Sequence, residues 1–83
     1  MSVVLKMRCS EKSEPQELLT VDGPRMAGHL LFGVAYADTP ENKEFFAATP
    51  SGEARFWTVN KAAQDFFDVN EEYYVTFTKA RKE

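Results

Sequence analysis

The chain has 83 residues, a net charge of −3 and a pI near 5.1, with 43% hydrophobic and 13% aromatic residues. This length predicts a single domain, 1–83, and excludes a second core. The apolar content excludes a disordered chain, and the acidic balance excludes a surface that is basic overall. No apolar run approaches the roughly 20 residues of a spanning helix, so we expect a soluble protein with no membrane partner.

The first strand is predicted at the start of the chain. In residues 2–10, apolar and polar side chains alternate with a period of two, which indicates a half-buried strand. The side chains expected on its inner face are Val3, Leu5, Met7 and Cys9. Residues 17–21 read as a short strand that ends at the Asp22-Gly23-Pro24 turn. Residues 28–37 are apolar on both faces, as in a central strand.

A hairpin is predicted around Thr49-Pro50-Ser51-Gly52, because proline at the second and glycine at the fourth position favour a type I turn. In this register Phe45 faces Phe56 inside the core. The opposite face then pairs Phe46 with Arg55, and Trp57 lies two residues further along.

The C-terminal part predicts a short helix and a closing strand. Asn60 is a good N-cap, and alanines and phenylalanines follow at helical spacing up to residue 68. The strand after it alternates, with Tyr73, Val75 and Phe77 inward and Tyr74 outward. The predicted fold is mainly β, a small SH3-like or OB-like β-barrel of about five strands with one short helix before the last strand.

The stretch from residue 41 to residue 80 resembles a group of small uncharacterised bacteriophage and prophage proteins. Their shared pattern is ENK, an aromatic pair, TPSG, an asparagine cap followed by alanines, and EYYV-x-FT-x-A. The matching positions are Glu41, Asn42, Lys43, Phe45, Phe46, Thr49, Pro50, Ser51, Gly52, Asn60, Ala62, Ala63, Phe67, Glu72, Tyr73, Tyr74, Val75, Phe77, Thr78 and Ala80. The chain departs from the pattern at Lys79, where proline is usual, and at residues 68–72, where Pro-Gly-Lys is usual. Asn70 can adopt the left-handed conformation of that glycine. The resemblance implies a phage source and a barrel fold, and it carries no activity.

The strongest candidate site is an outer strip on the predicted barrel. It consists of Phe46, Arg55, Trp57 and Tyr74. Exposed aromatic side chains next to an arginine are typical of peptide sites, base-stacking sites and subunit interfaces. The alternative is that the helix or the 11–16 loop covers these side chains and completes the core.

A basic strip is the second candidate, for contacts to phosphate. Its main members are Lys6, Arg8, Lys79 and Arg81, with Lys12 and Lys82 nearby. It requires that the first and last strands are neighbours. The alternative is that these charges protect strand edges against aggregation.

The sequence offers no catalytic or metal site. His29 and Cys9 are each the only residue of their kind, whereas a structural zinc site needs about four ligands. The glycines are too scattered for a phosphate loop. We therefore expect no metal, no cofactor and no enzymatic activity.

Three function classes follow. The first is a non-enzymatic phage accessory protein in the host cell cytoplasm that binds a host factor or a small nucleotide-like ligand, which includes anti-defence roles. The second is a small virion or assembly component that acts by self-association as a homo-oligomer. The third is a nucleic-acid-binding barrel, which salt-dependent binding to oligonucleotides would distinguish.

Overall fold

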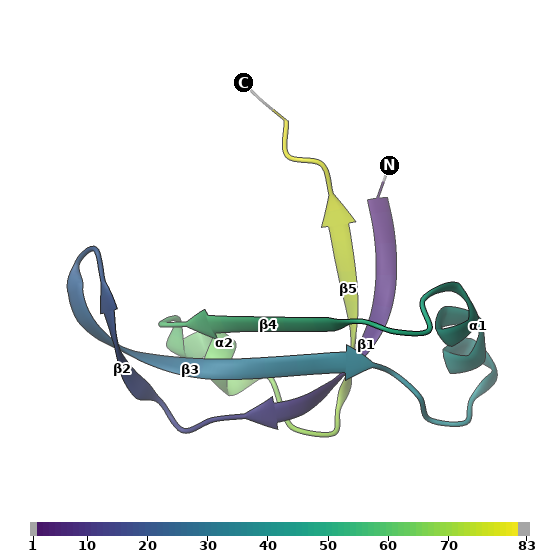
Figure 1. Cartoon of the computed structure of the whole chain (residues 1–83), viewed down its shortest axis with the longest axis horizontal. Coiled ribbons are helices and arrows are strands. Elements are labelled where there is room, and N and C mark those ends of the chain that lie inside the picture. Colours follow the sequence, from purple (N-terminus) through teal and green to yellow (C-terminus); the bar gives the residue numbers. More distant parts are fainter. Residues whose placement is uncertain (1, 82–83) are drawn as a thin grey trace.

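The computed structural model describes residues 2–81, which form an antiparallel sheet with two short helices (Figure 1). The elements in chain order are β1 (Ser2–Lys12), β2 (Gln16–Thr20), β3 (Gly23–Val34), α1 (Pro40–Ala48), β4 (Glu53–Thr58), α2 (Lys61–Phe66) and β5 (Glu72–Thr78). The prediction of a mainly β fold with five strands is confirmed.

The long strand β3 organises the sheet. β1 pairs with it through residues 7–12, and β2 continues the pairing along residues 23–27 of β3. β4 pairs with residues 28–33 of β3. β5 pairs with β1, so the first and last strands are neighbours, which is the condition that the basic strip required. Among residues 2–81, β4 and β5 share no ladder and the sheet does not close.

The helix predicted near residue 60 is present. It spans Lys61–Phe66, and the side chain of Asn60 accepts a hydrogen bond from the Ala63 backbone N–H at 3.2 Å. The turn after it contains Asn70 in the predicted left-handed conformation, with φ of 77°. The Asn70 N–H donates to the Cys9 carbonyl at 2.8 Å, which fixes the turn against β1.

The predicted hairpin around Thr49–Gly52 is wrong, because Pro40–Ala48 is the helix α1. Thr39 is its N-cap, and the threonine hydroxyl accepts a hydrogen bond from the Asn42 N–H at 3.1 Å. Pro40 stands at the first helical position and Glu41 in the first turn, where both favour a helix start. This capping signal outweighs the strand-like pair of phenylalanines.

Both aromatic partners of the expected hairpin lie elsewhere in the structure. Phe56 pairs with Leu30 of β3 rather than with Phe45, and its side chain is exposed. Phe45 lies on α1 and is half-buried; its ring centroid is 6.2 Å from that of Tyr74. The fold therefore has two helices instead of the one predicted.

The core lies where β1 crosses β3. Its buried cluster consists of Met7, Cys9, Leu30 and Phe32, and half-buried side chains of β1, β4, β5 and the segment after α2 pack around it. Phe32 contacts Phe67 and Tyr73 edge to face, with ring centroids 5.1 and 6.0 Å apart. These aromatic pairs join β3 to the two segments that flank the Asn70 turn.

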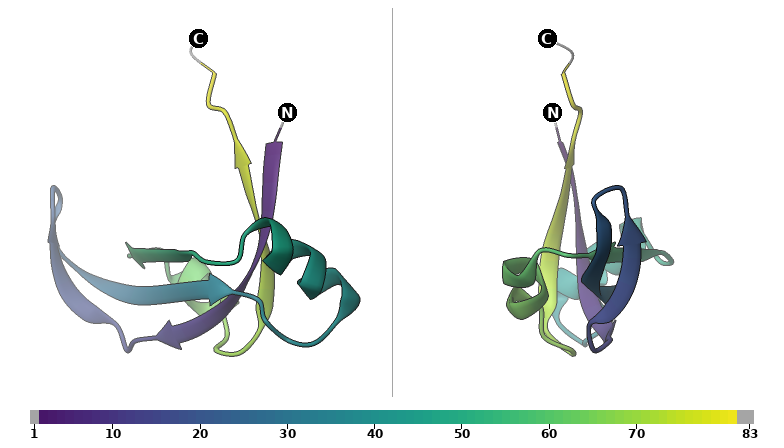
Figure 2. Two further views of the ribbon diagram at one scale, coloured as in Figure 1. Left: turned by 45° about the vertical axis from the view of Figure 1, so that its right-hand side comes forward. Right: turned by 90° about the vertical axis from the view of Figure 1, so that its left-hand side faces the viewer.

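The ends of the sheet project away from this core. In Figure 2 the ends of β1 and β5 rise together on one side of the molecule, and the β2–β3 hairpin extends at another. The radius of gyration is 14.9 Å, compared with about 12 Å for a compact domain of this length. Phe77 lies in the first projection and is 59% exposed, so the prediction that it faces the core is wrong.

A matched pair of leucine variants tests the position of the core. Leu30 is 1% exposed and Leu19 is 81% exposed. Leu30→Ala is expected to lower the free energy of unfolding by about 2–5 kcal/mol. Leu19→Ala is expected to change it by less than about 0.5 kcal/mol. Chemical denaturation followed by circular dichroism measures both, and equal losses would contradict the core assignment.

The N-cap of α1 gives a second test. Thr39→Ala removes the hydroxyl that accepts from Asn42 and is expected to cost about 1 kcal/mol of stability. Thr39→Ser keeps the hydroxyl and should behave like the wild type. If the alanine and serine variants have the same unfolding midpoint, residues 40–48 do not depend on this cap.

Candidate functional site

The four residues of the predicted aromatic strip do not come together. Phe46 is on α1 and Tyr74 on β5, whereas Arg55 and Trp57 are on β4. Trp57 packs against His29, with ring centroids 4.7 Å apart, and Arg55 Nη2 lies 3.8 Å from Glu53 Oε2. α1 and α2 lie at opposite ends of β4 (Figure 1), and Trp57 is near the α2 end. The strip assumed a hairpin that does not form.

Two of these residues and two of the basic residues meet instead around α1. The centre is a polar cluster of Lys6, Glu41, Glu72 and Tyr74. Lys6 Nζ lies 2.8 Å from Glu41 Oε1 and 3.5 Å from Glu72 Oε1. The Tyr74 hydroxyl donates to the same Glu41 oxygen at 2.6 Å. The cluster holds the first turn of α1 against the β1–β5 pair.

Asn42 completes this attachment from inside. It is 1% exposed, and its Nδ2 donates to Glu72 Oε2 at 2.8 Å. Because a carboxylate only accepts hydrogen bonds, this contact fixes which end of the amide faces Glu72. Within residues 2–81, the opposite atom, Asn42 Oδ1, is buried and has no donor within hydrogen-bond distance.

The cluster shifts the pKa values of its members. The hydrogen bond from Tyr74 to Glu41 raises the pKa of Tyr74 above its ordinary value of 10.0. Contact with the Glu41 carboxylate also raises the pKa of Lys6, and the Lys6 and Tyr74 hydrogen bonds lower the pKa of Glu41. The attachment is therefore complete at pH values above the pKa of Glu41 and below the pKa of Tyr74. It weakens when acid protonates Glu41 or when alkali deprotonates Tyr74.

A hollow of about 480 Å³ opens beside this cluster, and we call it the tyrosine hollow. Its walls include Lys6, Arg8, Tyr36, Asn70, Glu72 and Tyr74. The Arg8 guanidinium carbon lies 5.3 Å from the centroid of the exposed Tyr36 ring. Arg8 Nη2 also donates to Asn70 Oδ1, so the arginine is held in place from two sides.

Tyr36 also lines an apolar hollow of about 430 Å³, which we call the aromatic hollow. Tyr36, Ala37, Phe46 and Ala47 contribute its apolar surface, and Asn42 also lines it. Tyr36 and Ala37 line both hollows, so the two are adjacent. One ligand can therefore contact both hollows beside Tyr36.

The predicted basic strip does not assemble as a continuous surface. Lys6 is opposite Tyr74 in the ladder, and Thr78 is opposite Ser2. Lys79 and Arg81 follow Thr78, so Lys79 lies roughly 17 Å along the strand from the position of Lys6. Lys82 lies outside the described residues. Of the strip's residues within 2–81, Lys6 and Arg8 line one hollow together.

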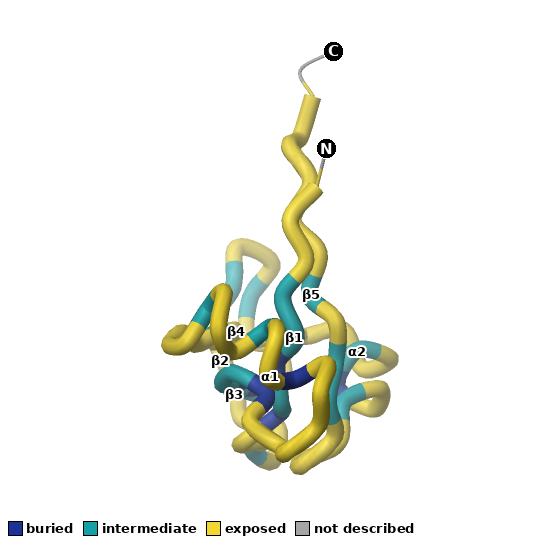
Figure 3. Tube along the Cα trace, turned by 90° about the vertical axis from the view of Figure 1, so that its right-hand side faces the viewer, coloured by how far each residue is buried: buried dark blue, intermediate teal, exposed yellow. Residues whose placement is uncertain are grey.

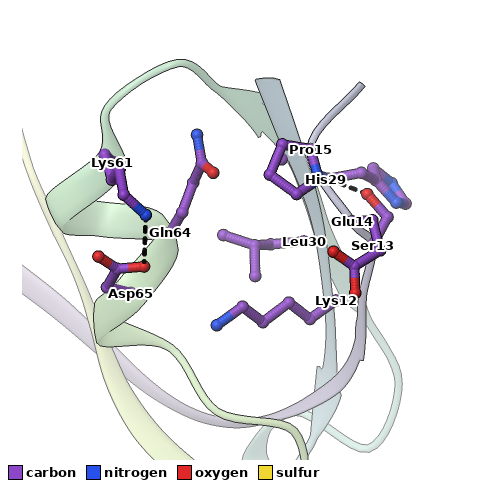
Figure 4. A pocket seen from close by; sticks show the side chains of 10 residues that line it. Lys12, Ser13, Glu14, Pro15, His29, Leu30, Lys61, Gln64 and Asp65 are labelled. Carbon is purple, nitrogen blue, oxygen red and sulfur yellow. Dashed lines mark hydrogen bonds and ion pairs between the residues drawn. The ribbon is translucent and has the colours of Figure 1, made fainter. Parts of the chain in front are cut away.

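A third hollow, also of about 480 Å³, lies between α2 and the bend that joins β1 to β2 (Figure 4). Its lysines make contacts within the protein, because Lys12 Nζ donates to the Phe67 carbonyl at 2.9 Å and Lys61 Nζ lies 3.4 Å from Asp65 Oδ1. Gly28 leaves room for Gln64, since a Cβ at this position would lie 3.1 Å from Gln64 Cγ. We interpret this region as the packing of α2 onto the sheet.

Cys9 and His29 do not form a nucleophile and base pair. Cys9 is fully buried, and this burial raises the pKa of its thiol above the ordinary value. His29 packs against Trp57 instead, with the two rings tilted by 37°. Residues 2–81 contain no group of three or more histidine, cysteine or acidic side chains suited to a metal ion. Neither helix of this part of the chain has the length and apolarity to cross a membrane.

Comparisons with protein families, with curated proteins and with solved structures found no match.

The sequence interpretation missed Tyr36, Asn42 and Asn70 as site residues. It treated residues 44–49 as a strand of the hairpin, which hid the helix that buries Asn42. The available signal was Thr39-Pro40-Glu41, a helix start that places Glu41 and Asn42 in the first turn. No local sequence signal marked Tyr36 as a site residue, because its position depends on the path of residues 35–39, which connect β3 to α1.

The polar cluster predicts a specific titration. In Glu41→Gln the Tyr74 hydroxyl loses its carboxylate acceptor, so the pKa of Tyr74 is expected to fall relative to the wild type. Glu71→Gln changes a nearby carboxylate that does not contact Tyr74 and serves as the control. Nuclear magnetic resonance of the tyrosine ring carbons follows each ring separately. An unchanged Tyr74 pKa in Glu41→Gln would contradict the contact.

Proposed function

We propose that the chain is a non-enzymatic binding protein that captures a small nucleotide-like ligand, with a planar ring and an anionic group, at the two hollows beside α1. The observation that carries this proposal is the Arg8 guanidinium, which lies over the Tyr36 ring at the wall of the tyrosine hollow. The arginine is thus positioned before any ligand arrives.

Arg8 supplies the contact for the anionic group. A guanidinium has five N–H donors in a planar fork, and Arg8 uses one nitrogen to donate to Asn70. The remaining donors can bind a phosphate or carboxylate. Lys6 contributes less, because Glu41 and Glu72 neutralise its charge. A single fixed arginine in a nearly neutral hollow favours a ligand of low charge over a polyanion.

The aromatic hollow supplies the contact for the planar group. Phe46 and Tyr36 contribute its aromatic surface, and both side chains are exposed in the unbound protein. Stacking of a base on an aromatic side chain is worth about 1–3 kcal/mol. A ligand that contacts Tyr36 in this hollow lies close to Arg8, whose guanidinium carbon is 5.3 Å from the Tyr36 ring centroid.

The proposed setting is that of a phage accessory protein in the host cell cytoplasm, which includes anti-defence roles. It is supported by the resemblance of residues 41–80 to bacteriophage and prophage proteins. A host protein is the alternative partner of the same surface. A role in the virion is the second alternative, and its support is the exposed apolar surface at the ends of the sheet. Nucleic-acid binding is less favoured, because the basic residues are dispersed.

For the fold type we propose an SH3-like rather than an OB-like arrangement. The support is the order of the elements, with the short helix α2 directly before the last strand and the first strand paired with the last. An OB-like arrangement places its helix after the third strand.

Calorimetric titration with adenosine monophosphate, a cyclic dinucleotide and adenosine tests the proposal. Wild-type protein is expected to bind at least one phosphorylated ligand and to bind adenosine more weakly. Arg8→Ala is expected to weaken that binding about tenfold or more, since it removes a charge-assisted hydrogen bond. Arg55→Ala is the matched control, because Arg55 lies outside both hollows, and should bind like the wild type.

Two outcomes count against this function. Absence of binding to every ligand by folded wild-type protein removes the nucleotide-like class. An equal loss in Arg8→Ala and Arg55→Ala would show that general charge, rather than the hollow, attracts the ligand.

A further inference from the structure

We propose that α1 is a lid that an anion releases. An anionic group bound in the tyrosine hollow takes Lys6 away from Glu41, and the first turn of α1 then detaches from the sheet. This release rests on the proposed function, because it is caused by the anionic group that Arg8 binds. We call the two states of the helix the docked form, which the structure shows, and the released form.

α1 is attached to the sheet mainly by polar side chains. It faces the viewer in Figure 3 and is coloured as exposed over most of its length. Within Pro40–Ala48, Asn42 is the buried residue and Phe45 is half-buried. A helix that buries one polar residue gains little from the removal of apolar surface from water. Its docking therefore depends on the polar cluster around Glu41.

The docked form leaves one hydrogen-bond acceptor without a donor. Asn42 is 1% exposed, and among residues 2–81 no donor reaches its Oδ1 atom. A buried acceptor that loses water and gains no partner destabilises the form in which it is buried. In the released form water can reach this atom. The unpaired acceptor therefore brings the two forms closer in free energy than the ion pairs of Lys6 alone would.

Lys6 is the contact for which α1 and an anion compete. Its Nζ lies 2.8 Å from Glu41 Oε1, and the lysine also lines the tyrosine hollow beside Arg8. Lys6 and Arg8 are two positions apart on β1, so they lie on the same face, roughly 7 Å apart along the strand. An ammonium on a flexible four-carbon chain can turn to a phosphate that a guanidinium holds at this spacing.

Negative charge decides which partner leaves. The carboxylates of Glu41 and Glu72 lie 2.8 and 3.5 Å from Lys6 Nζ, so they repel a phosphate that reaches this ammonium. Glu72 is in β5, opposite Arg8 in the ladder, and the sheet keeps it in place. Glu41 belongs to the first turn of α1, and its side chain is 48% exposed. The repulsion is therefore relieved by movement of α1, which also breaks the contact of Glu41 with Tyr74.

Apolar contacts keep α1 docked when no anion is present. Phe45 lies with Leu5, Met7 and Ala35 around a cavity of only about 10 Å³ between α1 and the sheet. Met7 and Ala35 are 4% and 1% exposed. Release uncovers part of this apolar surface, which favours the docked form. A ligand shifts this equilibrium only because it binds the released form more tightly.

Hydrogen exchange followed by nuclear magnetic resonance tests the lid, with inorganic phosphate as the anion. The amide N–H groups of Lys43 and Thr49 make hydrogen bonds of α1 itself, so their exchange rates report its opening. At constant ionic strength, phosphate is expected to raise both rates roughly fivefold or more. The control is the Ser13 N–H in the bend between β1 and β2, which donates to the His29 carbonyl and should change less than twofold.

Either of two results with phosphate overturns the lid. Phosphate that shifts the signals of the Arg8 side chain but leaves both α1 rates unchanged would show that anion binding and docking do not compete. Absence of phosphate binding up to tens of millimolar would show that Arg8 and Lys6 do not form the anion site on which the release depends.

A pair of variants tests the same competition in the other direction. A change that weakens docking must strengthen anion binding, because coupling between two equilibria is reciprocal. Glu41→Gln frees Lys6 and is expected to bind phosphate about tenfold more tightly than the wild type. Glu71→Gln removes the same charge from the wall of the hollow, and among residues 2–81 Glu71 makes no ion pair with Lys6. It should stay within threefold of the wild type, and equal gains in both variants overturn the competition.

The lid and the ligand class are tested separately. Adenosine monophosphate that binds but leaves the α1 exchange rates unchanged supports the proposed function and overturns the lid. Phosphate that releases α1 in a protein that binds no nucleotide supports the lid and overturns the nucleotide-like class.

Discussion

The structure depends on one strand that belongs to two ladders. β1 pairs with β3 through residues 7–12 and with β5 through residues 2–8, so Met7 and Arg8 have a neighbour on each side. The register shifts between Cys9 and Glu11, which bends the strand and continues the pairing towards β2. Met7 and Cys9 lie at this crossing and are buried there. The core, the attachment of α1 and the projection of the ends of β1 and β5 all follow from it.

The sequence predicted those elements whose signals are local. Alternation identified β1 and β5, and Asn60 identified the start of α2, because a period of two and a cap act within a few residues. It failed at α1, where paired phenylalanines and a proline–glycine turn suggested a hairpin. The competing helix-start signal at Thr39-Pro40 is equally local, and in the structure it determines the element.

The error at Phe77 has a different origin. Alternation correctly placed Phe77 on the same face as Val75 and Tyr73, and those two residues are half-buried. A period of two tells which face a side chain occupies, but it does not tell whether another element covers that face. β3 extends along β1 only as far as Met7, so the face of Phe77 continues beyond the layer that covers it. Such long-range information is absent from a single sequence.

The candidate site could be predicted only in part for the same reason. Lys6, Arg8, Phe46 and Tyr74 were identified as chemically suitable residues, and the structure places all four around α1. Their actual grouping depends on how the chain returns from β3 through residues 35–39. Glu41 has the central role, because one carboxylate accepts from Lys6 and Tyr74 and also lies in the first turn of α1.

The burial of Cys9 gives the molecule an internal probe of its own motions. The thiol is fully buried at the crossing of β1, and burial raises its pKa, so alkylating reagents reach it only when this region opens. Its labelling rate therefore measures the equilibrium between the closed and open forms of the crossing, with no engineered dye or label. Since Cys9 lies between the β3 ladder and the Asn70 turn, one natural thiol reports on the opening of this part of the sheet.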